Sequence, residues 1–394
     1  MDNKIRLGVI SDLHCTYDKD YYSQDTILFS NTMKDGNQKN QVQELVKLLK
    51  ENRLECDYLL CPGDITNKID VQGLISGFGY LQEIQQALKA KKLICVPGNH
   101  DVDSHHSHLK IFNKETDPLW HLDKDHYPLP DLNLSQLLLS QDYCLYKDEQ
   151  IAILCLNSVN CVTKLNDGSQ IIQISNVTLS KIEDDLKKIP DTIKVRVALT
   201  HHHPLTYSDL YPRYNEKQDL IANGDKLISL IGKYHFGLLI HGHKHKARLT
   251  TLDSVALFCS GGFSAVQNLQ GGDGENTFHI VELDISEPMK GVIRTWSYSQ
   301  SAGWKKPSSL FPETTGFGLT KTVKELAAEI GSYYKSKYLD KPEIRPFSET
   351  IEMFPDISYL DHTHIKEFYQ ELAKHKCRIG VYQDSDEQNI YYVP

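Results

Sequence analysis

Five short groups of aspartate, histidine and asparagine residues each follow directly on an apolar run of the chain. In order they read SDLH at Ser11–His14, GDITN at Gly63–Asn67, GNHD at Gly98–Asp101, HHP at His202–Pro204 and GHKH at Gly242–His245. Mixed carboxylate, imidazole and amide ligands suit divalent metals such as Mn, Fe and Zn better than Mg, which prefers an all-oxygen shell. The pattern predicts metal-dependent chemistry.

These groups contain too many candidate ligands for one tetrahedral ion. The candidates are Asp12, His14, Asp64, Asn99, His100, His202, His243 and His245. Two ions roughly 3.5 to 4 Å apart, with a shared carboxylate between them, would use such a set, and a metal pair of that kind clamps both oxygens of a phosphoryl displacement. Each residue alone could be a helix cap or part of an exposed loop. Together they bring five strand ends with unpaired polar groups to one place, which favours a ligand.

The apolar runs predict the strands that position these residues. We expect strands at residues 5–10, 58–61, 93–96, 150–157, 195–200 and 236–240, with amphipathic helices at about 42–49, 79–90 and 179–188 between them. In open α/β sheets, ligands bind at the carboxyl ends of the strands. Shorter apolar runs at 255–259, 278–283 and 291–296 are expected to form strands of a second sheet.

Three long loops follow strand ends, at residues 15–40, 102–149 and 205–216. We expect them to select the substrate, and we expect the second to be a partly helical insertion over the site, because it is too long for a simple connection. They carry no recognisable signature.

The chain after residue 296 differs in character. Residues 297–320 are rich in Ser, Pro, Gly and Lys and are expected to be a linker or surface strap, between a catalytic domain at 1–296 and a C-terminal α+β module at 321–394. Thr322 and Glu325 form a capping box before one helix, a second helix follows Asp361, and residues 378–382 and 389–393 read as a hairpin. The module's role is open, and self-association or partner binding are the hypotheses.

Composition narrows the class of protein. The net charge of −9 over 394 residues argues against a surface built mainly for nucleic acid, although a local basic groove is compatible with it. The nine cysteines are an odd number, and Cys61, Cys95 and Cys155 lie in apolar runs, which is typical of core residues in a reducing compartment. The chain has no Cys-x-x-Cys spacing of a zinc site. We find no signal-peptide pattern at the amino terminus and no apolar stretch of roughly 20 residues, so we expect a cytoplasmic protein without a membrane span.

The five groups, in this order and each after a strand, resemble the motifs of the calcineurin-like metallophosphoesterase family. The resemblance covers residues 5–245. It implies an α/β fold, a four-layer α/β/β/α sandwich of two mixed sheets flanked by helices, with the strands up to residue 296 completing it. It also implies two divalent metal ions, with Mn or Fe favoured and Zn as a further option.

The resemblance also implies a role for each motif residue. It assigns Asp12, His14 and His245 to the first metal, Asn99, His202 and His243 to the second, and Asp64 to a bridge between them. A metal-bound hydroxide would attack phosphorus in line, His100 would act as general acid or charge stabiliser, and Asp101 would orient His100. The family's His-x-Pro spacing selects His202 over His201, but the choice between them stays open.

Departures from the motifs bear on the substrate. GNHD in place of Gly-Asn-His-Glu, and the lack of Asp-Arg-Gly after GDITN, differ from the serine/threonine phosphatase branch. The complete Gly-His-x-His is similar to the phosphodiesterase branch, so we expect a phosphodiesterase that acts on a nucleotide-like or other small diester. The alternatives are a metal-dependent DNA or RNA nuclease, and an inert scaffold that binds a partner through its C-terminal module.

Overall fold

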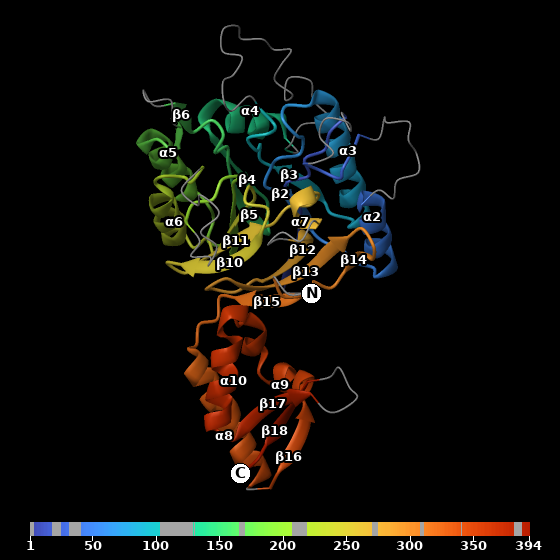
Figure 1. Cartoon of the computed structure of the whole chain (residues 1–394). Helices are drawn as coiled ribbons and strands as arrows, with labels where there is room; N and C mark the ends of the chain where they lie inside the picture. Colours follow the sequence, from blue (N-terminus) through green and yellow to red (C-terminus); the bar gives the residue numbers. More distant parts are fainter. Residues whose placement is uncertain are drawn as a thin grey trace. The chain divides into compact units, whose positions relative to one another are not determined.

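The structure is a computed structural model of the whole chain (Figure 1). It describes residues 4–17, 25–30, 41–102, 129, 131–164, 170–206, 219–269, 275–307, 311–339, 341–381 and 388–394. Most of the loop at 205–216 and much of the loops at 15–40 and 102–149 lie outside these residues. The described end of the loop at 102–149, the one expected to be partly helical, contains helix α4 (Leu132–Gln141) and strand β4 (Tyr143–Lys147).

The first mixed sheet begins with the amino-terminal strand. Its order is β14-β13-β12-β1-β2-β3, in which β1, β2 and β3 are parallel and β12 runs antiparallel to β1. The strands are β1 (Lys4–Val9), β2 (Tyr58–Cys61), β3 (Lys92–Cys95), β12 (Asn276–Asp284), β13 (Lys290–Ser299) and β14 (Gly303–Lys305). Strand β2 is buried throughout, as expected for a strand covered on both faces.

The second mixed sheet has the order β10-β11-β9-β8-β5-β4. Strands β5, β8, β9 and β11 are parallel, and β4 and β10 are antiparallel edges. In addition to β4, this sheet contains β5 (Ile151–Leu156), β8 (Val195–Leu199), β9 (Leu238–His241), β10 (Ala247–Leu252) and β11 (Val255–Ser260). A small hairpin, β6 (Val162–Lys164) with β7 (Gln170–Ile172), lies outside both sheets.

Helices cover the outer faces of the two sheets (Figure 1). Helices α2 (Gln41–Glu51) and α3 (Val71–Ala87) share one core with the first sheet, while α5 (Asn176–Leu186) and α6 (Gly224–Lys233) share another with the second. Helix α2 buries Val42, Leu45 and Leu49, which recur at helical spacing. The short helix α7 (Val266–Leu269) follows β11. The predicted α/β class with two mixed sheets and flanking helices is confirmed.

The expected membership of the sheets was wrong in one respect. The runs at 255–259, 278–283 and 291–296 do not form a separate sheet, because β11 pairs with β9 while β12 and β13 extend the sheet of β1. A local apolar pattern indicates a strand but not its pairing partner, which is distant in the chain. Helix α3 also begins earlier than expected, because the Asp70 carboxylate caps it by accepting the Gly73 N–H at 2.9 Å.

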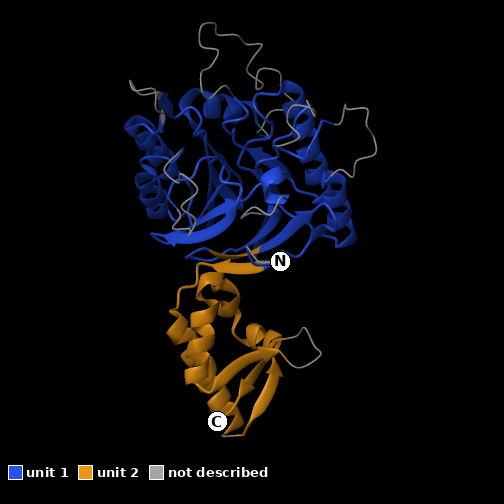
Figure 2. Cartoon of the chain, viewed as in Figure 1, with its two compact units in different colours: residues 1–289, 294–313 blue, residues 290–293, 314–394 orange. Residues whose placement is uncertain are grey.

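By its internal contacts the chain divides into two compact units, Met1–Met289 with Arg294–Glu313, and Lys290–Ile293 with Thr314–Pro394 (Figure 2). The segment 297–320, expected as a linker or strap, contains β14 and β15 (Thr314–Phe317). Among the described helices, each is too short or too polar to cross a lipid bilayer.

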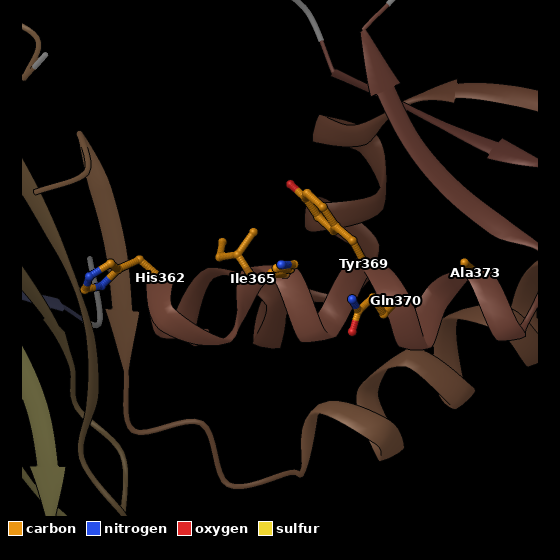
Figure 3. Close-up of a pocket in the computed structure, with 6 residues that line it drawn as sticks. His362, Ile365, Tyr369, Gln370 and Ala373 are labelled. Atoms are coloured by element: carbon orange, nitrogen blue, oxygen red, sulfur yellow. The ribbon is translucent and has the colours of Figure 1, made fainter. Parts of the chain in front are cut away.

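The second unit has its own apolar core. Its antiparallel sheet runs β16 (Glu343–Pro346), β18 (Gln388–Tyr392), β17 (Cys377–Val381), and its helical elements are α8 (Val323–Tyr338), α9 (Phe347–Met353), η2 (Pro355–Tyr359), η3 (His362–His364) and α10 (Ile365–Lys374). The predicted capping box of Thr322 with Glu325 and the predicted hairpin, β17 with β18, are both present. A shallow groove follows η3 and α10, lined by His362, Ile365, Lys366, Tyr369, Gln370 and Ala373 (Figure 3).

Candidate metal centre

The carboxyl ends of five strands bring the predicted residues together. The loop after β1 is tied to the loop after β2, since the Asp12 N–H donates to Gly63 O at 3.0 Å and the His14 N–H to Asp64 O at 3.0 Å. The loop after β9 is tied to the first loop across the two sheets, because the His243 N–H donates to Asp12 Oδ1 at 3.0 Å. The site therefore lies where the two sheets meet.

A first cluster consists of Asp12, His14, Asp64 and His245. His14 Nε2 lies 2.9 Å from His245 Nε2 and 3.7 Å from Asp64 Oδ2, and His245 Nε2 lies 3.3 Å from Asp12 Oδ1. The side chains of Asp12 and Asp64 are at most 2% exposed. Two buried carboxylates and two imidazoles that converge on one point are a donor set that fits a divalent cation.

A second cluster consists of His201, His202 and His243, with Asn99 beside it. Asn99 Oδ1 lies 3.0 Å from His201 Nε2 and 3.0 Å from His243 Nδ1. The predicted ligand His202 belongs to this cluster, but so does His201, whose Nε2 also lies 3.3 Å from Asp64 Oδ2. Asp64 therefore contacts both clusters, as a bridging carboxylate must.

The backbone at the site is unusual. Asp12, His14, Asp64, His243 and His245 all have positive φ, between 44° and 73°. Left-handed backbone costs a residue other than glycine about 1–2 kcal/mol, and such outliers gather at functional sites. Two glycines allow close packing there, since a side chain at Gly98 would overlap Asp64 and one at Gly242 would overlap Ser11 and Asp12.

His100 and Asp101 contact different partners. The His100 backbone N–H donates to Asp64 Oδ1 at 2.7 Å. Its ring Nδ1 lies 3.2 Å from the backbone nitrogen of Lys68 and 3.1 Å from Asn67 Oδ1. The Asp101 carboxylate accepts the backbone N–H groups of Thr66 at 2.9 Å and Gly98 at 2.8 Å. Any effect of Asp101 on His100 thus passes through the loop backbone.

The pKa values divide the histidines into two groups. Burial, with a neighbouring imidazole, lowers the pKa of His14 to about 3 and holds the pKa values of His202 and His243 well below their usual range. Burial acts in the same direction on His201 and His245, but Asp64 raises the pKa of His201 to about 9 and Asp12 raises the pKa of His245. Without a cation, His201 is therefore protonated at pH 7 against Asp64, and Asp12 favours the protonated form of His245.

Sequence reasoning missed the side chains that contact the outer nitrogens of these histidines. Ser158 Oγ lies 2.8 Å from His202 Nδ1, the Gln267 amide lies 2.9 Å from His245 Nδ1, and Asp219 Oδ2 lies 3.4 Å from His243 Nε2. Ser158 directly follows the expected fourth strand, so its position at a strand end could have indicated that it lies at the site. Asp219 and Gln267 belong to no motif, and nothing local distinguishes them.

This geometry defines a metallophosphoesterase centre on a two-sheet α/β scaffold. The family model of the calcineurin-like phosphoesterases matches residues 5–247. The chain belongs to that family, and the predicted membership is confirmed. No curated protein matches this chain in sequence.

Solved structures share the fold at low sequence identity. One is a purple acid phosphatase from yellow lupin (Lupinus luteus) seeds, with 12% identity, a TM-score of 0.51 and coverage of 79% of this chain. This chain spans only about half of that one, 53%. Another is a dimetal phosphatase from Danio rerio, with 12% identity, a TM-score of 0.45 and coverage of 74% of this chain and 95% of that one.

Proposed function

We propose that this chain is a dinuclear metal-dependent phosphodiesterase that hydrolyses a nucleotide-like or other small phosphodiester. The observation that carries the proposal is the position of Asp64, whose Oδ2 lies 3.7 Å from His14 in one cluster and 3.3 Å from His201 in the other. A carboxylate shared by two donor sets is what a metal pair requires.

Asp12, His14, Asp64 and His245 would hold one cation. Asp64, Asn99, His201, His202 and His243 would hold the other, with His201 added to the ligands that the motifs indicate. Mn and Fe accept such mixed oxygen and nitrogen sets, and Zn is a further candidate. Two bound divalent cations would offset phosphate charge and lower the pKa of a water between them.

His100 is suited to stabilise the leaving group as a hydrogen-bond donor. Because a backbone N–H can only donate, the Lys68 N–H requires Nδ1 of His100 to accept, and the Asn67 side chain must then present its NH₂ group, not Oδ1, to that nitrogen. The ring proton of the neutral imidazole is then on Nε2. Burial lowers the pKa of His100, so the ring is neutral at pH 7. We propose that this Nε2–H faces the leaving-group oxygen and donates a hydrogen bond that stabilises the negative charge developing there, without transferring the proton.

The charges next to His100 favour a diester. Lys68 Nζ lies 2.6 Å from Asp25 Oδ2, so that carboxylate offsets its positive charge. A phosphomonoester carries nearly two negative charges at pH 7, whereas a diester carries one. A neutralised lysine adds little attraction for the second charge. The departures from the serine/threonine phosphatase motifs agree with this preference.

A comparison of two esters tests the proposal. Mn-loaded protein is given a chromogenic aryl phosphodiester and the matching monoester, with Asp64→Ala as the inactive control. We expect hydrolysis of the diester, with the higher kcat/KM, and none by the variant. Faster monoester cleavage would overturn the diesterase assignment, and protein that binds two cations but cleaves neither ester would favour the scaffold hypothesis.

The cysteines support a cytoplasmic location. All nine are free thiols and all are buried. Buried thiols that form no disulfide are typical of proteins in a reducing compartment.

A further inference from the structure

The contacts of His243 point to a positioning residue outside the motifs. Its Nδ1 lies 3.0 Å from Asn99 Oδ1, on the side of the second cluster, and its Nε2 lies 3.4 Å from Asp219 Oδ2. The imidazole therefore lies between a predicted ligand and a carboxylate. Histidines that bind metal commonly donate their other ring N–H to a carboxylate, a carbonyl or a water, which fixes the tautomer and the ring plane.

Three of the other candidate histidines show the same arrangement. The outer nitrogen of His201 contacts Pro62 O at 2.9 Å, that of His202 contacts Ser158 Oγ at 2.8 Å, and that of His245 contacts Gln267 at 2.9 Å. For His243 the corresponding outer partner is Asp219. It is a carboxylate, whereas the other three partners are a carbonyl, a hydroxyl and an amide.

The backbone that follows Asp219 is anchored. Two residues further on, the Ile221 N–H donates to His203 O at 3.0 Å, and the Ala222 N–H donates to Ile172 O at 2.8 Å. Asp219 has φ 59°, a left-handed conformation that aspartate and asparagine tolerate better than most residues. Its side chain is 31% exposed, against 12% for His243, so Asp219 borders the cluster on the solvent side.

We propose that Asp219 is a positioning residue for the second cation, which accepts a hydrogen bond from His243 Nε2–H and so directs Nδ1 toward the ion. The inference rests on the proposed dinuclear function. It differs from the motif assignment because Asp219 contacts a ligand and not the ion. Loss of such an outer partner typically costs 10–100-fold in metal affinity.

Mn²⁺ titration of the full-length, metal-free protein tests the inference. Asp219→Gly removes the carboxylate without straining the left-handed backbone, and Asp219→Asn keeps an oxygen acceptor and the same shape. We expect Asp219→Gly to weaken the second cation by about 10–100-fold and to leave the first unchanged. We expect Asp219→Asn to stay close to wild type. Gln267→Ala is the matched control, because it removes an outer partner from the first cluster.

Calorimetry gives both affinities, and low-temperature electron paramagnetic resonance separates coupled Mn pairs from single ions. An Asp219→Gly protein with wild-type affinity at both sites would overturn the inference while the proposed function stood. Equal weakening at both sites, together with a lower Tm, would make Asp219 a folding residue and also overturn it. Wild-type protein that takes up fewer than two cations would overturn the proposed function as well.

Discussion

The two clusters of the candidate metal centre differ in chemistry although they share Asp64. The first contains two carboxylates and two imidazoles, whereas the second contains three imidazoles and the Asn99 amide around the shared carboxylate. Carboxylates attract a cation by charge, but neutral imidazoles bind only when a ring nitrogen points at the ion. We therefore expect the first site to bind more tightly, and the second to depend more on side-chain orientation.

The outer contacts agree with this difference. In the second cluster, His201 and His202 have buried partners, Pro62 O and Ser158 Oγ, whereas His245 in the first cluster contacts the exposed side chain of Gln267. A buried hydrogen bond cannot be replaced by water at low cost. The rings of His201 and His202 are thus held more firmly than that of His245, whereas His243 in the second cluster depends on the partly exposed Asp219.

The largest expected effect comes from the residue that both clusters share. Asp64→Asn keeps the side-chain shape but removes the charge that lies between His14 and His201. Because this carboxylate contacts both donor sets, we expect the second cation to be lost, the first to bind more weakly, and kcat/KM to fall by more than the roughly 100-fold that an outer partner costs. Metal analysis and diester hydrolysis measure these effects.

Asp225→Asn is the control, because Asp225 is exposed on α6. Asp64→Asn protein that retained two tightly bound cations would show that neither cluster needs the Asp64 charge. The idea of two sites joined by a shared carboxylate would then be wrong.

The next effect separates His201 from His202. Both belong to the second cluster, but the Nε2 of His201 also contacts Asp64 and Asn99. We therefore expect His201→Ala to reduce both second-site affinity and turnover more than His202→Ala does. Titration of each variant with Mn²⁺ measures the difference. If His202→Ala lost the second cation and His201→Ala kept it, His202 would be the ligand, as the His-x-Pro spacing predicts, and our expectation for His201 would be wrong.

Local sequence was sufficient to predict residues that the structure brings together in the two clusters, but not their detailed contacts. Asp12, Asn99 and His245 could be found because each follows an apolar run, and a strand places its end without reference to the rest of the chain. In a row of three histidines, side-chain rotamers decide which ring faces Asp64, and the spacing does not encode them. Asp219 and Gln267 reach the site through distant loop contacts, so the motifs could not reveal them.

The same limit applies to the fold. The apolar runs located β9 and β11 but not their pairing, and β12 was expected in one sheet with β11, because pairing depends on contacts between distant segments. The capping box at Thr322 was predictable, since Thr322 and Glu325 are only three residues apart. Features that depend on neighbouring residues were readable, and features that depend on tertiary contacts were not.

The pH dependence of cation binding is the third test of the comparison. With its pKa raised to about 9 by Asp64, His201 is protonated at pH 7 and must lose its proton before Nε2 can bind an ion. Second-site affinity should therefore rise with pH, by up to about tenfold per unit below pH 9, and level off above it.

His201→Gln should flatten this dependence at the second site and leave the first site, where Asp12 raises the pKa of His245, still dependent on pH. Calorimetry in buffers of different ionisation enthalpy measures the released protons. An unchanged slope in the variant would assign the proton to another group.

The smallest expected effects compare the outer partners of the two clusters. Ser158→Ala leaves the outer nitrogen of His202 buried without its 2.8 Å partner, and water reaches that position only with difficulty. We expect about a tenfold loss of second-site affinity. Gln267→Ala should cost the first site less, because Gln267 is at the surface and water can take its place against His245. Equal losses of affinity in the two Mn²⁺ titrations would show that ligand orientation matters equally at both sites. A larger loss for Ser158→Ala would confirm that the second site, with its three imidazoles, depends more on the side chains that contact the outer nitrogens of its ligands.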